Sequence, residues 1–503
     1  MERNRSQSAS LPFPVGGENS RDPILEMDQG YAISMVNIFP QGSYGELRRG
    51  SRVHSSGMGS GAVPFLYEYA LQSGTRKLIA GANGRLYDAS TLSGTATSLG
   101  SGFTSNWWQA ATYLNIAIFV NGADQPQQYD GTTLSAATYT GIADDANLYD
   151  VCVYKERLYF IDKNNQSFWY GATGTVTGAL TEFEVGSFLT KGGYLQKIAS
   201  WTTNTGSGMQ DLLVLISSEG EILTYSGTDP ATDFALEGRF FIPRPVGQRK
   251  CAKNIGADLF ILHMEGVTSL GSLMQGVDAS GAYTQFNDLI APTYTRAAQQ
   301  YESNTGWDFC FYPAANWAII NVPTSSDANS YQHVMNTKYR SWCRFTGLRA
   351  VSWCTFNNLI YFGGVDGKVY QANYGANDNS QPIQFNIKFP FNYFGIRDRV
   401  KIFHTASAQI MSSNTVNLNF SIDVDGQDSA VTGTSVVSTG ESSDWDTSDW
   451  DTTDWADEES YSTTVEGLYG LGRAGALKIS GNVSNIRLRF SSAQVRYEIG
   501  GYL

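Results

Sequence analysis

The sequence predicts an all-β protein: a β-propeller-like domain of six to seven irregular blades, followed by a C-terminal β-sandwich-like domain. The first observation behind this prediction is composition. Of the 503 residues, 13% are aromatic and only 16% are charged, whereas charged residues make up about 25% of a typical soluble domain. Aromatic and β-branched side chains favour strands, and the 52 glycines, with Asn, Asp and Ser, favour the turns between strands.

The second observation is a hairpin that recurs along the chain. Its clearest copy is LIYFGGVDGKVYQ, from Leu359 to Gln371, where Asp366-Gly367 separates two β-prone runs. Gly accepts the positive φ of a tight hairpin turn without a Cβ clash, so Asp-Gly is a strong hairpin signal. Further turns are predicted at Asn83-Gly84, Asn121-Gly122, Asn164-Asn165, Glu219-Gly220 and Glu265-Gly266, with a looser pairing of residues 317–322 with residues 334–345.

The spacing of these hairpins favours a propeller. Successive copies start about 40 to 60 residues apart, which is the length range of one propeller blade. Each blade of a propeller is a small antiparallel sheet, and the radial arrangement leaves only short exposed edges. The alternative is a stack of unrelated β-meanders. A helix is predicted only around Thr295 to Tyr301.

Three regions are expected along the chain. Residues 1–30 are polar, contain Pro12 and Pro14, and predict an extended N-terminal arm, while residues 31–375 carry the propeller-like domain. From residue 376 to residue 503 the strands alternate apolar and polar residues, as in VNLNFSIDVDGQ from Val416 to Gln427. Period-two segments separated by turns are typical of a β-sandwich, so this region is predicted to be a sandwich-like domain with an insert at residues 440–460.

The insert contains the run ESSDWDTSDWDTTDWADEES, which has an unusual five-residue period. This period matches neither the two-residue period of a strand nor the 3.6-residue period of a helix, so an extended loop is predicted. Three tryptophans are costly to leave exposed in an acidic loop, and we expect them to pack on one another, on the sandwich or on a neighbouring subunit. The candidate contact residues are Asp444, Trp445, Asp446, Asp449, Trp450, Asp451, Asp454 and Trp455.

Charge and apolar patterning narrow the classes of function. The net charge is −13 and no cluster of Lys and Arg suited to gripping phosphates occurs, so tight DNA binding is disfavoured. An acidic surface can still face DNA that slides past it. The longest apolar stretches, such as Ile116 to Val120, have strand length, so no membrane-spanning segment is expected. The N-terminus lacks the apolar run of a secretory signal, which favours synthesis in the cytoplasm.

Motifs for catalysis, cofactors and metals are not found. His54, His263, His333 and His404 have no ligand spacing to one another, and the five cysteines contain no CxxC pair, so buried free thiols are expected. The run DVDGQD from Asp423 faintly resembles a calcium loop but lacks the later Glu, and a hairpin turn is favoured. No enzymatic activity, cofactor or metal is predicted. A paired-carboxylate site stays open, and with it a carbohydrate-binding or glycan-hydrolysing propeller.

Both ends of the chain resemble a known family. The stretch PFPVGGENSRDPILEMDQGYAISMVNIFP resembles the opening of tail stabilisation, or nozzle, proteins of short-tailed bacteriophages, whose Val-Asn-(Leu/Met/Ile)-(Tyr/Phe)-Pro strand corresponds to residues 36–40. Repeated Trp-Asp steps, as in DWDTSDWDTTDW, also look like a loop of these proteins, although there the run often ends in Trp-Gly and here Ala456 follows Trp455. The closing strands from Ile486 to Tyr497 are similar too.

The resemblance implies a structural virion protein of the viral tail, made in the host cytoplasm. Such proteins look like β-propellers with added β domains, and they carry no enzymatic activity. Six copies form a hexameric ring, the tail nozzle or tail hub, beneath the portal and the adaptor (the head-to-tail connector). The ring helps to retain the packaged genome and conducts DNA during ejection without binding it specifically, and it also meets tail fibres, spikes or a needle. The third alternative is a receptor-binding or scaffold propeller outside bacteriophages.

Overall fold

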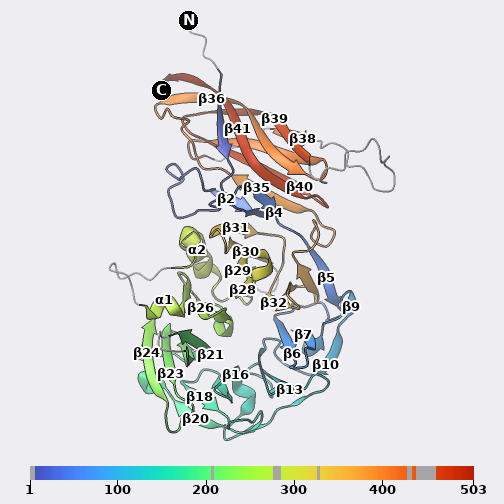
Figure 1. Ribbon diagram of the computed structural model, residues 1–503, viewed down its shortest axis with the longest axis vertical. Coiled ribbons are helices and arrows are strands. Elements are labelled where there is room, and N and C mark those ends of the chain that lie inside the picture. The colour runs from blue at the N-terminus through green and yellow to red at the C-terminus, as the bar shows by residue number, and fades with distance from the viewer. Residues whose placement is uncertain are drawn as a thin grey trace.

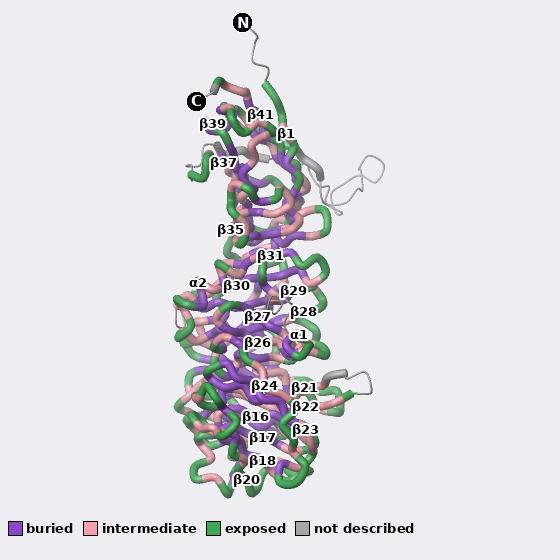
Figure 2. Tube along the Cα trace, turned by 90° about the vertical axis from the view of Figure 1, so that its left-hand side faces the viewer, coloured by how far each residue is buried: buried purple, intermediate pink, exposed green. Residues whose placement is uncertain are grey.

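A computed structural model describes residues 6–204, 209–275, 285–325, 329–427, 433–437 and 460–502. The fold is all-β, as predicted: a propeller at one end of an elongated molecule and a sandwich at the other (Figure 1). The first and last described residues both lie at the far end of the sandwich. Turned by 90°, the molecule is much narrower, because the propeller is a disc seen edge-on (Figure 2).

The described residues form seven blades. Each of the first four is an antiparallel sheet of four strands that follow one another in the chain. The strands are β6 (Phe65–Ala70), β7 (Arg76–Ala82), β8 (Arg85–Asp88) and β10 (Thr97–Ser101) in blade one; β11 (Gln109–Tyr113), β12 (Ile116–Val120), β13 (Gln127–Tyr129) and β14 (Leu134–Ala136) in blade two; β16 (Leu148–Tyr154), β17 (Arg157–Asp162), β18 (Ser167–Tyr170) and β20 (Thr181–Glu184) in blade three; and β21 (Leu195–Asn204), β22 (Met209–Ser217), β23 (Glu221–Ser226) and β24 (Ala235–Phe241) in blade four.

Blade five has three described strands, β25 (Ala252–Ile255), β26 (Asp258–His263) and β27 (Gly266–Ser269). The helices α1 (Leu270–Met274) and α2 (Ala291–Tyr301) follow it in the chain, and α2 contains the helix predicted around Thr295. Blade six consists of β28 (Asp308–Tyr312), β29 (Trp317–Ser325), β30 (Asn329–Asn336) and β31 (Ser341–Phe345).

Blade seven closes the ring with strands from both ends of the propeller. Its first three strands are β32 (Ser352–Phe356), β33 (Leu359–Gly363) and β34 (Val369–Ala372), and its fourth is β5 (Ser51–Ser56), which precedes blade one in the chain. Backbone hydrogen bonds between the first and last segments therefore hold the circle shut. The short strand β9 (Gly94–Thr95) pairs in parallel with β5 at the edge of blade seven, and the short strands β15 (Tyr139–Thr140) and β19 (Gly178–Ala179) pair with each other.

The seven predicted hairpins have one structural role, since each is formed by the second and third strands of a blade. The turns at Asn83-Gly84 and Asp366-Gly367 connect β7 to β8 and β33 to β34. The loosest copy differs in detail. Residues 317–322 pair with β30, from Trp317 opposite Asn336 to Val322 opposite Tyr331, while residues 341–345 form the separate strand β31.

The sandwich has two sheets. One sheet contains β3 (Ile38–Pro40), β4 (Gly45–Leu47), β41 (Leu488–Tyr502), β36 (Arg399–Ser412) and β39 (Ser460–Gly472), with β1 (Gln7–Pro12) also paired to β41. The other sheet contains β2 (Ser34–Val36), β35 (Ile383–Lys388), β40 (Gly475–Val483), β37 (Val416–Val424) and β38 (Gly433–Val437). Parallel pairing of β2 with β31 joins this second sheet to blade six, which gives one nine-stranded sheet across both domains.

The N-terminal segment differs from the extended arm expected at residues 1–30 and from the domain start expected at residue 31. Strand β1 pairs with β41 along its whole length, and β2, β3 and β4 pair with sandwich strands before the chain enters the propeller at β5. The strand that the resemblance places at residues 36–40 is split at Asn37, whose φ of 59° turns the chain from one sheet into the other. Asn adopts this left-handed conformation more readily than most residues.

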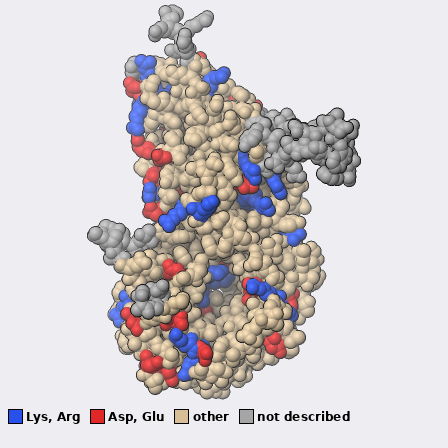
Figure 3. Space-filling view, viewed as in Figure 1, with Lys and Arg blue, Asp and Glu red and all other residues tan. Residues whose placement is uncertain are grey.

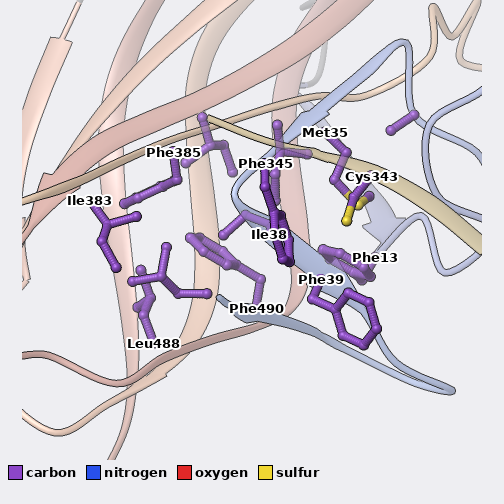
Figure 4. Close-up of a cluster of buried hydrophobic side chains, with 14 of the residues drawn as sticks. Phe13, Met35, Ile38, Phe39, Cys343, Phe345, Ile383, Phe385, Leu488 and Phe490 are labelled. Atoms are coloured by element: carbon purple, nitrogen blue, oxygen red, sulfur yellow. The ribbon is translucent and has the colours of Figure 1, made fainter. Parts of the chain in front are cut away.

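One apolar core runs from blades six and seven into the sandwich. It joins Phe345 of blade six and Trp353 of blade seven to Ile38, Phe385 and Phe490 of the sandwich, all of them buried. Figure 4 shows these sandwich side chains packed around the N-terminal strands. Since burial of large apolar side chains is the main favourable contribution to folding, the two domains stabilise each other through this shared core.

Candidate functional site

The eight predicted contact residues, from Asp444 to Trp455, lie outside the described residues. The structure describes the strands on either side of the insert. Strand β38 ends at Val437 and β39 begins at Ser460. The insert therefore connects the last described strand of one sandwich sheet to the last described strand of the other.

The segments that carry the family resemblance come together in the sandwich. Residues 36–40 contribute β2 and β3, and residues 486–497 contribute most of β41, which pairs with β4. These two segments lie at opposite ends of the chain. The resemblance at both chain ends therefore falls on a single structural unit.

Asn37 is the centre of the junction between this unit and the propeller. Its Nδ2 donates to the carbonyl oxygens of Thr346 and Gln384 at 3.2 and 2.7 Å, and its Oδ1 accepts from the backbone N–H of Thr346 at 2.9 Å and from Arg48 Nε at 2.8 Å. Arg48 in turn makes an ion pair with Asp378 at 2.5 Å. A single amide side chain thus connects blade six, the start of the chain and the sandwich strand β35.

The loop before β2 also contacts blade six, through close backbone packing and an ion pair. Gly17 has a φ of +79°, and a Cβ there would lie 2.3 Å from the carbonyl oxygen of Trp342, so only glycine fits. The next residue, Glu18, is buried, accepts a hydrogen bond from the N–H of Met35 at 3.1 Å and pairs with Arg344 Nη2 at 2.5 Å. These contacts explain the Gly-Gly-Glu sequence of this segment.

An uncovered apolar row lies on β39, which is the last strand of its sheet in the described chain. Val465, Tyr469 and Leu471 are 63%, 85% and 64% exposed, and Ile402 of β36, which pairs with Leu471, is 41% exposed. Gly467 stands between them on the same face, with no atom within 4 Å of a Cβ built there. We call these five residues the β39 row. Contiguous exposed apolar surface of this kind marks interaction sites.

Polar groups border the β39 row. On β36 and β41, His404 lies 3.6 Å from Glu498, and Arg496 is exposed beside them. Beneath the row, the buried Lys401 donates to the carbonyl oxygens of Ile396, Arg399 and Arg473, and burial lowers the pKa of this lysine. An apolar centre with a polar rim is the usual anatomy of a protein–protein interface.

Sequence reasoning missed the β39 row, although the sequence contains a signal for it. In STTVEGLYGLG, from Ser462, the outward positions Val465, Tyr469 and Leu471 alternate with the inward Leu468, so both faces of the strand carry apolar residues. A strand with only one buried face normally alternates apolar and polar residues. Apolar residues on both faces indicate that the second face is also covered, and no part of the chain that the structure describes covers it.

No group of His, Cys, Asp and Glu suited to a metal ion is found among the described residues. Within the same residues, neither α1 nor α2 has the length and apolar character needed to cross a lipid bilayer.

No protein-family model matches the chain, and no curated protein matches it. The solved structures that are similar include YCF48 bound to D1 peptide, with a TM-score of 0.34 and 11% identity over 74% of this chain and 96% of that chain. YCF48 from Cyanidioschyzon merolae has a TM-score of 0.37 and 10% identity, over 62% of this chain and 96% of that chain. BBS1N in complex with ARL6DN has a TM-score of 0.39 and 8% identity, over 65% of this chain and 97% of that chain. At these TM-scores the likeness carries no argument about function, and the fold rests on the chain's own strand pairing.

Proposed function

We propose that this chain is a structural subunit of the tail nozzle of a short-tailed bacteriophage. Six copies form a ring that extends the channel of the portal and the adaptor, helps to retain the packaged genome and conducts DNA during ejection. The subunit carries no enzymatic activity in this role, and DNA passes without specific binding. The tail fibres, spikes or needle are its further partners.

One observation carries the proposal. The two chain ends that resemble nozzle proteins build one sandwich, and this sandwich presents the β39 row to its surroundings. A second copy of the chain is the occupant that fits this row, because an edge strand with exposed apolar side chains is suited to burial against another subunit. The acidic insert immediately precedes β39 in the chain, and its three tryptophans lie outside the described residues.

The charge of the chain supports the role of a conduit. The net charge is −13, and negative surface repels the phosphates of DNA within the screening distance of the solution, about 8 Å at physiological salt. A channel wall that held DNA tightly would slow ejection. The apolar core and the polar junction that the two domains share also suit a part that must keep its shape under the pressure of a packaged genome.

The test of the proposal is assembly. The full-length protein, mixed with the adaptor and portal of a short-tailed bacteriophage that contains it, is expected to give six-fold rings by electron microscopy. The double variant Tyr469→Ser/Leu471→Ser removes the two largest side chains of the β39 row. Each buried side chain of this size contributes about 1.5–3 kcal/mol, so each subunit contact should weaken at least about a hundredfold.

The matched control is Leu92→Ser/Leu359→Ser, which removes two exposed apolar side chains from the propeller. It should form rings like the wild type, and both double variants should keep the thermal midpoint of the wild type, because the four side chains are exposed. A wild-type protein that stays monomeric and binds neither adaptor nor portal contradicts the proposal. Rings that form equally well in both double variants contradict the assignment of the β39 row.

A further inference from the structure

The axis of the propeller contains a cavity of about 400 Å³. The innermost strand of every blade contributes to its wall, from β6 in blade one to β32 in blade seven. Figure 3 shows it as a hollow at the centre of the disc, with Lys and Arg atoms inside it. A second cavity of about 620 Å³ shares Lys253 and Asn254 with the first and is lined by blades five, six and seven, including Thr355 and Asn358 of blade seven.

The wall of the axial cavity has more positive than negative charges. The basic residues are Lys197, Arg249, Lys250 and Lys253, and the acidic residues among the lining and its immediate ion pairs are Asp150 and Asp308. This excess stands out in a chain whose net charge is −13. Since water-excluded walls focus an electric field, a local excess of two positive charges attracts anions into the cavity.

Both carboxylates already have partners. Asp150 pairs with Lys197 at 3.0 Å and accepts the N–H of Ile198 at 3.0 Å. Asp308 pairs with Lys250 at 3.2 Å and accepts the N–H of Trp353 at 3.1 Å. Each acid therefore balances one lysine, and these two pairs leave Arg249 and Lys253 to account for the excess charge.

Arg249 is buried, with 6% of its surface exposed. Its Nη1 donates to the carbonyl oxygen of Tyr149 at 3.0 Å, and the ring of Tyr149 lies 4.3 Å from the guanidinium carbon. A guanidinium has five N–H donors in a planar fork that matches carboxylate and phosphate groups. Among the described residues no carboxylate lies within ion-pair distance of it. Asp150 attracts it electrostatically but is already paired with Lys197, and burying a cation without a direct ion-pair partner is costly.

Lys253 lies on β25 at the boundary of the two cavities. In the described part of the chain its ammonium group has no hydrogen bond and no ion pair, and its electrostatic neighbours are Asp308 and the thiols of Cys310 and Cys354. The second cavity leads to this lysine. A ligand that enters from that side meets Lys253 before it reaches the centre of the axial cavity.

From this geometry we infer that the propeller axis is a binding site for a small oxyanion, one that carries phosphate or carboxylate groups. Arg249 holds one such group through its free donors, and Lys253 supplies the second positive charge. The volume suits a small molecule and excludes a nucleic-acid duplex. This inference does not depend on the proposed role in a phage tail.

The test uses the full-length protein and two probes, inorganic phosphate and citrate, at constant ionic strength set with sodium chloride. Isothermal titration calorimetry is expected to detect binding of at least one probe, and that probe should raise the thermal midpoint, because a ligand of the native state stabilises it. Phosphate binding without citrate binding identifies a phosphate site, and the reverse identifies a carboxylate site.

Lys253→Met should weaken binding about tenfold, the loss expected for one charged contact. Arg249→Met should abolish it, and because Arg249 is buried, Lys253→Met serves as the variant that keeps the fold. The control is Lys163→Met, which removes an exposed lysine from a loop of blade three and should bind like the wild type. Absence of binding for both probes overturns the inference, as does an equal loss in Lys163→Met and Lys253→Met.

Discussion

His263 and His333 lie deep in the propeller and are almost completely buried. His263 Nε2 is 2.7 Å from Thr268 Oγ1, and the ring of His333 packs 5.1 Å from that of Tyr331. Burial lowers the pKa of His263 to about 4, and burial together with Arg344 lowers the pKa of His333 to about 3. Both side chains are therefore neutral parts of the core at physiological pH.

These two pKa values predict acid sensitivity. In the unfolded chain a histidine has a pKa of about 6.5, so between about pH 6.5 and the folded value the unfolded state binds more protons and stability falls as the pH falls. At pH 5 each histidine costs about 2 kcal/mol relative to pH 7. In His333→Leu, the loss of unfolding free energy between pH 7 and pH 5, measured by urea denaturation, should be smaller by about that amount. Parallel pH curves for variant and wild type would contradict the prediction.

The cysteines behave as the sequence suggested. All five are free thiols; Cys354 is partly exposed and the other four are buried. Burial raises the pKa of Cys152, Cys251 and Cys354 to about 12. A thiol reacts as its thiolate, so these side chains act as small apolar residues around the propeller axis.

At the scale of the element, the recurring hairpin is the unit from which the propeller is built. It forms the second and third strands of every blade, and in blades one to four and in blade seven its turn contains a residue with a positive φ. At the predicted Glu265-Gly266 turn Gly266 is already part of β27 and its φ is not positive. The turn at Gly367 has a second requirement. Its φ is +69°, and a Cβ there would lie 1.9 Å from the carbonyl oxygen of Gly59, in the loop after β5.

The variants Gly367→Ala and Gly375→Ala distinguish the cost of the positive φ from the cost of the close contact with Gly59. Gly375 also has a positive φ, +61°, but a Cβ added there would have no other atom within 4 Å. Gly375→Ala should therefore cost only the backbone strain, about 1 kcal/mol. Gly367→Ala should cost at least about 2 kcal/mol more, because the turn must move away from the loop after β5. Urea denaturation of both variants measures the difference, and equal losses would show that the contact with Gly59 is unimportant.

At the scale of the whole molecule, the two domains share a sheet, a core and one polar junction. The sheet link is narrow, a single pairing of Val36 with Arg344, so the junction around Asn37 matters for the coupling. We expect the wild type to unfold in a single calorimetric transition. The shared apolar core makes separation of the domains costly, because it would expose large buried side chains to water.

Asn37→Ala should weaken this coupling. The change leaves buried Arg48 Nε and the N–H of Thr346 without an acceptor, which should cost at least about 3 kcal/mol and begin to separate the sandwich transition from the propeller transition. Asn83→Ala is the control, because Asn83 also has a positive φ, 49°, but is an exposed turn residue of blade one. Its expected loss is about 1 kcal/mol. A similar loss in both variants, with one transition each, would contradict the role of Asn37.

What the sequence determined is local. Turn chemistry at pairs such as Asn83-Gly84 and Asp366-Gly367 acts over a few residues, so the hairpins could be predicted from the chain alone. The number of hairpins then predicted six to seven blades. The period-two pattern from Val416 likewise predicted strands of the sandwich. The candidate site could be predicted only in part from the sequence. The predicted acidic insert lies outside the described residues, and the β39 row was missed because its exposure depends on which strand ends a sheet.

What the tertiary structure decided is non-local. No local signal assigns β5 to blade seven or sends residues 34–47 into the sandwich, because those pairings depend on strands hundreds of residues away. The same holds for the propeller axis. Lys197 belongs to β21 of blade four, whereas Arg249 and Lys253 lie four residues apart at the start of blade five, and the closed ring of blades brings both stretches to one cavity. Ring closure is a property of the whole fold, so this concentration of charge appears only once the chain has folded.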